Sequence, residues 1–192
     1  MKGSIILSGV GGMGILKASE VIAHLVVQEG LAVRQSEVHG MAQRGGSVVT
    51  HLRYGEEAFS PLLFRGEADF MLAFEELEAL RYLPYLKRGG TVILNRLVLC
   101  PPGVDPSRYP KSVPEILRNA GYNVTSIPAT DIALSLGDIR VTNTVLLGAF
   151  SRVFPIGSEK SWKEAFQKAF RGKNLEQNLE AFSRGRNFYD AS

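Results

Sequence analysis

Four glycines lie close together near the start of the chain, at Gly9, Gly11, Gly12 and Gly14. An apolar run precedes them, and a run with helical spacing begins at Ile15. A strand, a glycine turn and a helix in this order can hold phosphate, because glycine tolerates unusual φ angles and lets an anion approach the backbone. The helix N-terminus adds unpaired N–H groups and a partial positive charge. The alternative is a tight turn at the edge of an α/β sheet.

A second glycine-punctuated stretch, residues 39–46, carries polar side chains. It combines the imidazole of His39, the amide of Gln43 and the guanidinium of Arg44. A guanidinium presents forked donors that match phosphate or carboxylate oxygens. The alternative is a solvated hairpin turn. The flanking glycines favour a functional loop over a simple turn.

Carboxylates and a thiol are also present, but their pattern predicts no metal site. Glu75, Glu76 and Glu78 open a predicted helix without sharing one face, so we expect a solvated N-terminal turn. Cys100 follows an apolar run and is expected to be a small buried side chain at a strand end. One cysteine excludes an internal disulfide, a C-x-x-C pair and an all-thiolate iron–sulfur site within the chain.

The elements that must position these groups alternate along the chain. Strands are expected at 4–8, 32–38, 47–54, 68–74, 91–95 and 123–127, and helices at 15–29, from 75, and at 114–120, 130–136, 142–154, 158–170 and 173–189. This order predicts an α/β, Rossmann-like three-layer fold with a mainly parallel sheet and a C-terminal helical tail from about residue 142. No linker or repeat divides residues 1–192, so a single domain is expected.

Composition narrows the function classes. The chain has 192 residues, is 45% hydrophobic and 21% charged, and carries a net charge of +3. The sequence has no basic stripe with interleaved aromatic residues, so nucleic-acid binding is not predicted. No run approaches the ~18 apolar residues of a membrane span. The N-terminus lacks a basic segment and a small-residue cleavage site, which argues against a signal peptide. We therefore expect a cytoplasmic protein.

The glycines also permit a nicotinamide-binding interpretation. Gly9, Gly11 and Gly14 match G-x-G-x-x-G, and Glu37 lies near the end of the second strand, where an acidic residue would hold the adenine ribose. The first alternative is accordingly a free-standing NAD-binding enzyme. The second is a binding or scaffold module without a ligand of its own.

Larger patterns resemble one enzyme family over essentially the whole length. They are the glycine loop, residues 36–49, Asn143-Thr144 with 147–149, and the tail 174–185. Together they are similar to the small (β) subunit of indolepyruvate ferredoxin oxidoreductase, and thereby to the γ subunit or domain of 2-oxoacid:ferredoxin oxidoreductases. Residues 36–49 are the most specific part of this resemblance.

The resemblance implies a role within a larger enzyme. A large α subunit in this family carries thiamine diphosphate and iron–sulfur clusters, decarboxylates an aryl pyruvate and passes electrons to ferredoxin. The product is the aryl acetyl thioester of coenzyme A. The small subunit would complete this complex, be inactive alone and supply no catalytic side chain. The sequence leaves open whether the chain alone forms a homodimer.

The resemblance also implies a coenzyme A site, because the γ-type domain of related enzymes helps to bind that cofactor. The expected contacts are the glycine loop with one lysine for the phosphates, and the 36–46 loop near the acyl group: Gly9, Gly11, Gly12, Gly14, Lys17, Ser36, His39, Gln43 and Arg44. The family commonly has glutamine where this chain has Val10 and Met13. Contacts at those two positions are therefore expected from the backbone alone.

Overall fold

A computed structural model describes residues 1–39, 45–56, 60–101 and 103–188. Its helices and strands are β1 (Gly3–Val10), α1 (Ile15–Gln28), β2 (Ala32–His39), β3 (Ser47–Gly55), β4 (Ala68–Ala73), α2 (Glu76–Tyr82), β5 (Leu86–Asn95), α3 (Val113–Asn119), β6 (Asn123–Ile127), α4 (Ala129–Ser135), α5 (Thr142–Phe150), α6 (Glu159–Ala169) and α7 (Lys173–Asn187), with 3-10 turns η1 (Leu83–Tyr85), η2 (Pro106–Arg108) and η3 (Ile139–Val141). The predicted α/β alternation is confirmed.

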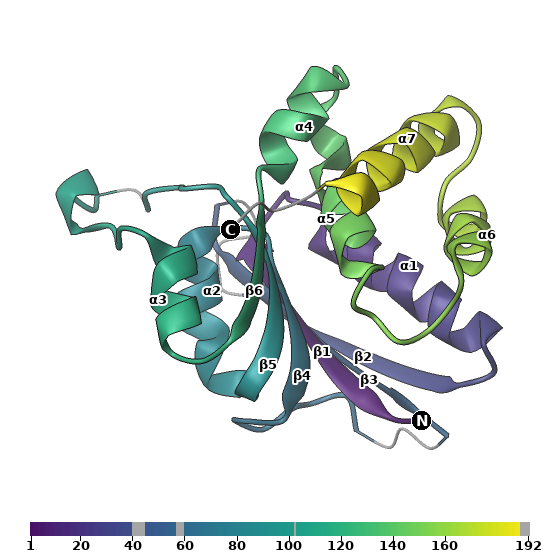
Figure 1. The fold of residues 1–192 in the computed structure, drawn as a ribbon, viewed down its shortest axis with the longest axis horizontal. Coiled ribbons are helices and arrows are strands. Elements are labelled where there is room, and N and C mark those ends of the chain that lie inside the picture. Colours follow the sequence, from purple (N-terminus) through teal and green to yellow (C-terminus); the bar gives the residue numbers. More distant parts are fainter. Residues whose placement is uncertain (40–44, 57–59, 102, 189–192) are drawn as a thin grey trace.

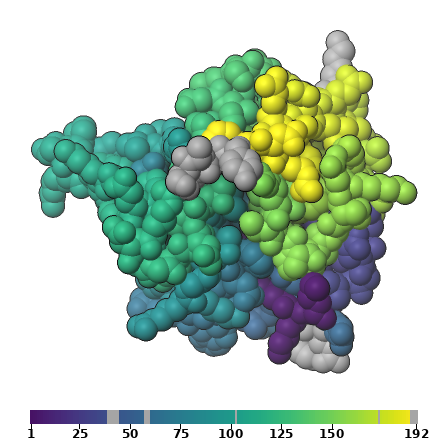
Figure 2. Space-filling view, in the orientation of Figure 1, coloured from purple at the N-terminus to yellow at the C-terminus, as the bar shows by residue number. Residues whose placement is uncertain are grey.

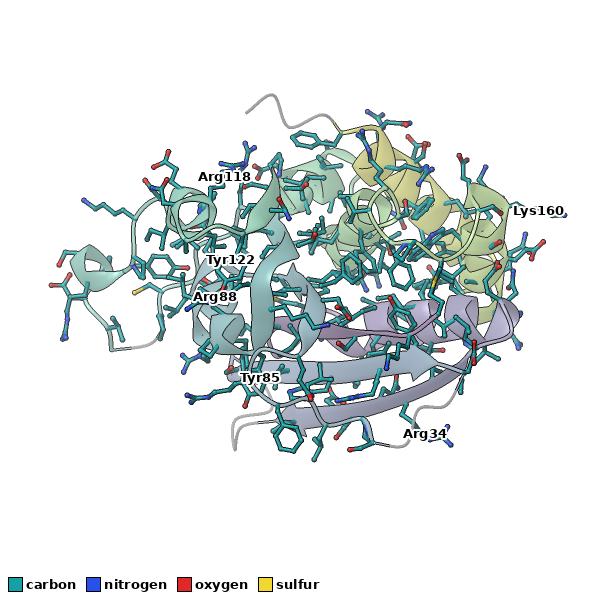
Figure 3. All side chains as sticks on the ribbon, turned by 60° about the horizontal axis from the view of Figure 1, so that its bottom comes forward. Arg34, Tyr85, Arg88, Arg118, Tyr122 and Lys160 are labelled. Atoms are coloured by element: carbon teal, nitrogen blue, oxygen red, sulfur yellow. The ribbon has the colours of Figure 1, made fainter. Side chains whose placement is uncertain are left out.

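The described strands form one sheet in the order β2-β3-β1-β4-β5-β6. The pairs β1–β4, β4–β5 and β5–β6 are parallel, which confirms the mainly parallel sheet. The strand β3 is antiparallel to both β1 and β2 and lies between them. The edge strand β2 therefore has β3 as its neighbour instead of β1, and Figure 3 shows Arg34 of β2 pointing outward from this edge.

Helices cover both faces of the sheet, and side chains of one strand point alternately to the two faces. Figure 1 shows α1, α5, α6 and α7 on one side and α2 and α3 on the other. Ile5 and Leu7 of β1 belong to the larger apolar cluster beneath α1 and α5, whereas Ile6 belongs to the cluster beneath α2 and α3. The result is a three-layer arrangement with a core on each face.

The C-terminal helices form much of the larger core. Every residue of α5 from Asn143 to Phe150 is buried, and α7 contributes Ala181 and Phe182. The ring of Trp162 from α6 packs against Phe182, with ring centroids 5.7 Å apart. The expected helical C-terminal region is thus confirmed, and it covers one face of the sheet.

Two predictions about polar and thiol side chains were wrong. Glu75, Glu76 and Glu78 are buried instead of solvated. The long connection after β5 covers Glu75 and Glu76, whereas Glu78 faces β3, where it accepts a hydrogen bond from the Ser47 hydroxyl, and pairs with Arg81 at 3.0 Å. Burial raises the pKa of the Glu76 carboxyl, and the neighbouring charge of Glu75 raises it further. The strand β5 ends at Asn95, so Cys100 lies beyond it, partly exposed, with its Sγ 3.3 Å from the Val104 carbonyl oxygen.

His51 provides a pH-dependent test of this fold. Its Nδ1 accepts a hydrogen bond from the Leu63 N–H at 3.0 Å, and burial lowers the pKa of His51 below its ordinary value of 6.5. Below pH 6.5 the imidazole of His51 is protonated in the unfolded chain but stays neutral in the folded chain until the pH is lower. The free energy of unfolding should therefore decrease as the pH is lowered through this range.

In His51→Asn, whose amide oxygen can accept the same bond, this pH dependence should be absent. The raised pKa of Glu76 acts in the opposite sense, but it does so in both proteins and cancels in the comparison. Urea unfolding at a series of pH values measures the difference. Equal slopes for the two proteins would contradict the role given to His51.

Candidate functional site

The glycine loop joins β1 to α1 with the geometry expected of an anion seat. Gly14 is the residue before α1 and has φ 74°, and Gly12 has φ 103°. Among the residues that the structure describes, no side chain caps this end of the 14-residue helix. The first N–H groups of an α-helix have no partner within the helix, so those of the first turn of α1 are available to a ligand.

The four glycines have different roles. A Cβ at Gly9 would lie 2.7 Å from Cβ of Phe74, so this glycine permits close packing of strand and loop. The N–H of Gly11 is already engaged, donating to the Gly46 carbonyl oxygen at 2.9 Å. Gly12 has open space around it, whereas a Cβ at Gly14 would meet Asn143. Of the four, Gly12 and Gly14 line the pocket described next.

A pocket of about 420 Å³ opens beside this loop, beyond the carboxyl ends of β1, β4 and β5. Its apolar wall consists of Met13, Phe74, Leu97, Leu99, Ile139 and Phe170. Its polar groups come from Lys17, Asn95, Thr130, Arg140, Thr142 and Asn143. The connections after β1 and β4 leave toward opposite faces of the sheet here, and α/β folds bind ligands at such a switch point.

Two cationic side chains stand at the rim of the pocket, and each has an acidic partner. The Nζ of Lys17 lies 2.6 Å from Oε2 of Glu20 and 5.4 Å from the centre of the Phe170 ring. Arg140 forms a forked pair with Asp138, with Nη2–Oδ2 at 2.7 Å, and this guanidinium lowers the pKa of the Asp138 carboxyl. An anionic ligand would have to compete with these carboxylates.

Asn143 connects the glycine loop to the C-terminal helices. Its Nδ2 donates to the Gly14 carbonyl oxygen at 3.1 Å, and its Oδ1 lies 3.3 Å from the Thr144 hydroxyl oxygen. That hydroxyl donates its one proton chiefly to Oδ1 of Asn178 on α7, and the contact with Asn143 is the longer branch of a shared hydrogen bond. All three side chains are buried. This chain of hydrogen bonds fixes the positions of α5 and α7 relative to the loop. It explains why the sequence pattern has asparagine both at position 143 and at position 178.

Asn95 performs a similar task on the opposite wall. Its Nδ2 donates to the Phe74 carbonyl oxygen at 3.0 Å and to the Thr130 hydroxyl at 2.9 Å. Asn95, Thr130, Arg140 and Asn143 line the pocket but were not predicted as site residues. A usable signal was present for Asn95, because it is a polar residue that directly follows a buried strand run.

The structure brings together part of the predicted site. Gly12, Gly14 and Lys17 line the pocket, and Gly9 and Gly11 support the loop. Ser36 lies within the edge strand β2 opposite His51 and does not line this pocket, so the structure does not place it beside the loop. The His39 side chain, Gln43 and Arg44 lie outside the described residues.

The arrangement of strands does not support the NAD alternative. In a Rossmann unit the strand that carries the ribose-binding acid is the neighbour of the first strand. Here β3 separates β1 from β2, which carries Glu37. The carboxylate is thus displaced by one strand from the position that this interpretation requires.

A second pocket, of about 590 Å³, lies at the opposite end of the sheet. Charged side chains line it, and they pair with one another: Lys87 with Asp69 at 2.6 Å and Arg53 with Glu67 at 2.8 Å. It is formed where β1 begins, remote from the N-terminus of α1. The features of an anion site therefore occur together at the pocket beside the glycine loop.

Comparison with known proteins identifies the family. Residues 4–188 match the model of the pyruvate ferredoxin/flavodoxin oxidoreductase family. The chain belongs to this family. It is a small subunit of a 2-oxoacid:ferredoxin oxidoreductase, as its relatives indicate.

Its similarity to particular relatives extends over nearly its full length. It is 38% identical over 191 residues to the indolepyruvate oxidoreductase subunit IorB of Thermococcus kodakarensis, covering 95% of this chain and 93% of that protein. It is 39% identical over 194 residues to the subunit of the same name from Archaeoglobus fulgidus, covering 97% and 95%. The predicted resemblance to the small subunit is confirmed.

Solved structures show the same fold. The γ subunit of a keto/oxoacid ferredoxin oxidoreductase from Geobacter sulfurreducens has a TM-score of 0.72 at 24% identity, covering 95% of both chains. The 2-oxoglutarate:ferredoxin oxidoreductase from Magnetococcus marinus, solved with 2-oxoglutarate, coenzyme A and succinyl-CoA bound, has a TM-score of 0.74 at 27% identity. The match covers 96% of this chain and 30% of that chain, so the same fold forms part of a larger polypeptide there.

Proposed function

We propose that this chain is the small subunit of an enzyme that oxidises aryl pyruvates such as indolepyruvate to aryl acetyl-CoA, and that it holds part of the coenzyme A. The observation that carries the proposal is the uncapped N-terminus of α1, which faces a largely apolar pocket with Lys17 and Arg140 at its rim. Coenzyme A has anionic phosphates and long uncharged parts. The helix N-terminus and the two cationic side chains suit the phosphates, and the apolar wall suits the uncharged parts.

The residues of the pocket fit coenzyme A in kind. Backbone N–H groups of the first turn of α1 would bind phosphate oxygens, since a helix N-terminus favours anions. Lys17 and Arg140 would exchange their carboxylate partners for phosphate. The apolar wall would bury the uncharged part of the cofactor. Coenzyme A supplies the thiol that accepts the acyl group.

The redox chemistry is assigned to a larger partner subunit, which would carry thiamine diphosphate and the iron–sulfur clusters and reduce ferredoxin in the cytoplasm. One cysteine in the sequence cannot supply the four thiolates of a typical cluster. The relatives support a multi-subunit enzyme, since each is named as a subunit of an oxidoreductase or a synthase. We expect the isolated small subunit to be inactive.

A pair of substitutions with opposite effects tests the coenzyme A site. In the enzyme assembled from both subunits, Lys17→Ala should raise the apparent KM for coenzyme A about 10- to 100-fold, through loss of one charge-assisted contact. Glu20→Gln should lower that KM, because it releases Lys17 from its carboxylate partner. Steady-state kinetics with varied coenzyme A measure both effects.

Lys163→Ala is the matched control, since Lys163 is an exposed lysine on α6 paired with Glu159 at 2.9 Å. It should leave the KM for coenzyme A unchanged. Equal KM values for Lys17→Ala and Lys163→Ala would reject the proposed site. The alternative of a ligand-free scaffold predicts that outcome, together with weaker assembly of the subunits.

A further inference from the structure

The connection from β5 to α3 forms one wall of the pocket. This strap, residues 96–101 and 103–112 in the described chain, contributes Leu97 and Leu99 to the apolar lining. Figures 1 and 2 show it extending to the left side of the molecule, away from the sheet. Connections of this length without regular secondary structure are often functional. Such a wall needs an anchor, because the strap has no sheet or long helix of its own.

Glu75 provides that anchor from beneath the strap. It precedes α2 and is 1% exposed. Its Oε1 accepts hydrogen bonds from the Leu99 N–H at 2.9 Å and from the Tyr109 hydroxyl. Its Oε2 accepts from the Glu78 N–H at 3.0 Å. Glu75 thus binds both halves of the strap to the start of α2.

Tyr109 completes the anchor. Its hydroxyl accepts a hydrogen bond from the Leu77 N–H at 2.9 Å while donating to Glu75. Burial and the adjacent carboxylate raise the pKa of Tyr109, so the hydroxyl keeps the proton that it donates. A further backbone bond, from the Glu76 N–H to the Leu97 carbonyl oxygen at 3.0 Å, fixes the first residue of the wall.

Three donors therefore converge on one buried carboxylate that does not itself line the pocket. A buried charge is costly unless such bonds satisfy it. An amide cannot replace it, because its NH₂ group would face at least one of the three donors. A carboxylate is thus specifically suited to hold the strap.

We propose that Glu75 and Tyr109 are positioning residues, which hold Leu97 and Leu99 against the pocket and so set its affinity for the uncharged part of coenzyme A. This inference rests on the proposed function of the pocket. Neither side chain would touch the cofactor. Their effect would pass through the backbone of the strap.

The test combines hydrogen exchange with kinetics. In the full-length chain, Glu75→Gln and Tyr109→Phe should each accelerate exchange of the Leu99 amide about tenfold or more, because its anchor opens more often. In the assembled enzyme both should raise the KM for coenzyme A about tenfold, with kcat within about twofold of wild type. Tyr109→Phe is the milder change, since it keeps the carboxylate and its two backbone donors.

Glu115→Gln is the control, because it removes a carboxylate from the exposed surface of α3 and should change neither readout. Unchanged exchange of the Leu99 amide in both test variants would overturn the proposal that Glu75 and Tyr109 hold the strap in place. Faster exchange with a wild-type KM would overturn the link from anchor to affinity. The proposed function fails separately: in that case coenzyme A would not slow exchange in the first turn of α1 or at Leu99 in the wild-type complex.

Discussion

Gly185→Ala is expected to lower the free energy of unfolding by about 3 kcal/mol, at the upper end of the usual cost of overpacking. An added Cβ at Gly185 would lie 1.9 Å from the carbonyl oxygen of Val145 and 2.7 Å from its carbonyl carbon. These are backbone atoms of α5, which cannot rotate away as a side chain does. The two helices would have to separate.

The separation would disturb the larger core as well as the contact itself. Gly148 of α5 makes the reciprocal approach, since a Cβ there would lie 2.2 Å from the Phe182 carbonyl oxygen of α7. Moving α7 outward would loosen Phe182, which is fully buried, and stretch the bond between Thr144 and Asn178. Because both glycines serve one interface, Gly148→Ala combined with Gly185→Ala should cost less than the sum of the two.

Urea unfolding of the full-length chain measures these effects. Ser183→Ala is the control, an exposed position two residues away on the same helix, and should change the free energy of unfolding by less than about 0.5 kcal/mol. A similarly small change for Gly185→Ala would show that α5 and α7 do not pack as closely as the structure places them.

Local patterns were sufficient to predict the elements that depend on neighbouring residues. The glycine loop was predicted because strand, turn and helix signals follow one another between Gly3 and Gln28. The α/β alternation followed from apolar runs of strand length separated by helical spacing. Lys17 was expected at the site from the family resemblance and not from a local pattern, and it does line the pocket.

Features that depend on distant residues could not be predicted in this way. Nothing local indicates that β3 would lie between β1 and β2, since strand order depends on pairing across the sheet. The acidic residues before and within α2 resemble a solvated helix start, and only the strap more than twenty residues later buries Glu75. Asn143 lies 129 residues from Gly14 in sequence, so its role at the loop emerges from the fold alone.

The bond between Asn143 and Gly14 leads to the second large effect. Gly14→Ala should lower the free energy of unfolding by about 2–4 kcal/mol, through left-handed backbone strain and loss of a buried hydrogen bond. Gly14 has φ 74°, and a Cβ there would lie 2.6 Å from Nδ2 of Asn143. The amide would have to move away from the Gly14 carbonyl oxygen, to which it donates.

Gly12→Ala separates the two causes, since Gly12 also has positive φ but has open space around it. It should show the backbone strain alone, about 1–2 kcal/mol. Combining Gly14→Ala with Asn143→Ala should cost less than the sum of the single changes, because the shorter side chain removes the collision. Urea unfolding of the wild type and the four variants gives each value. Equal losses for Gly12→Ala and Gly14→Ala, with additive behaviour in the double variant, would mean that Asn143 does not fix the loop, and that α5 and the anion seat are positioned independently.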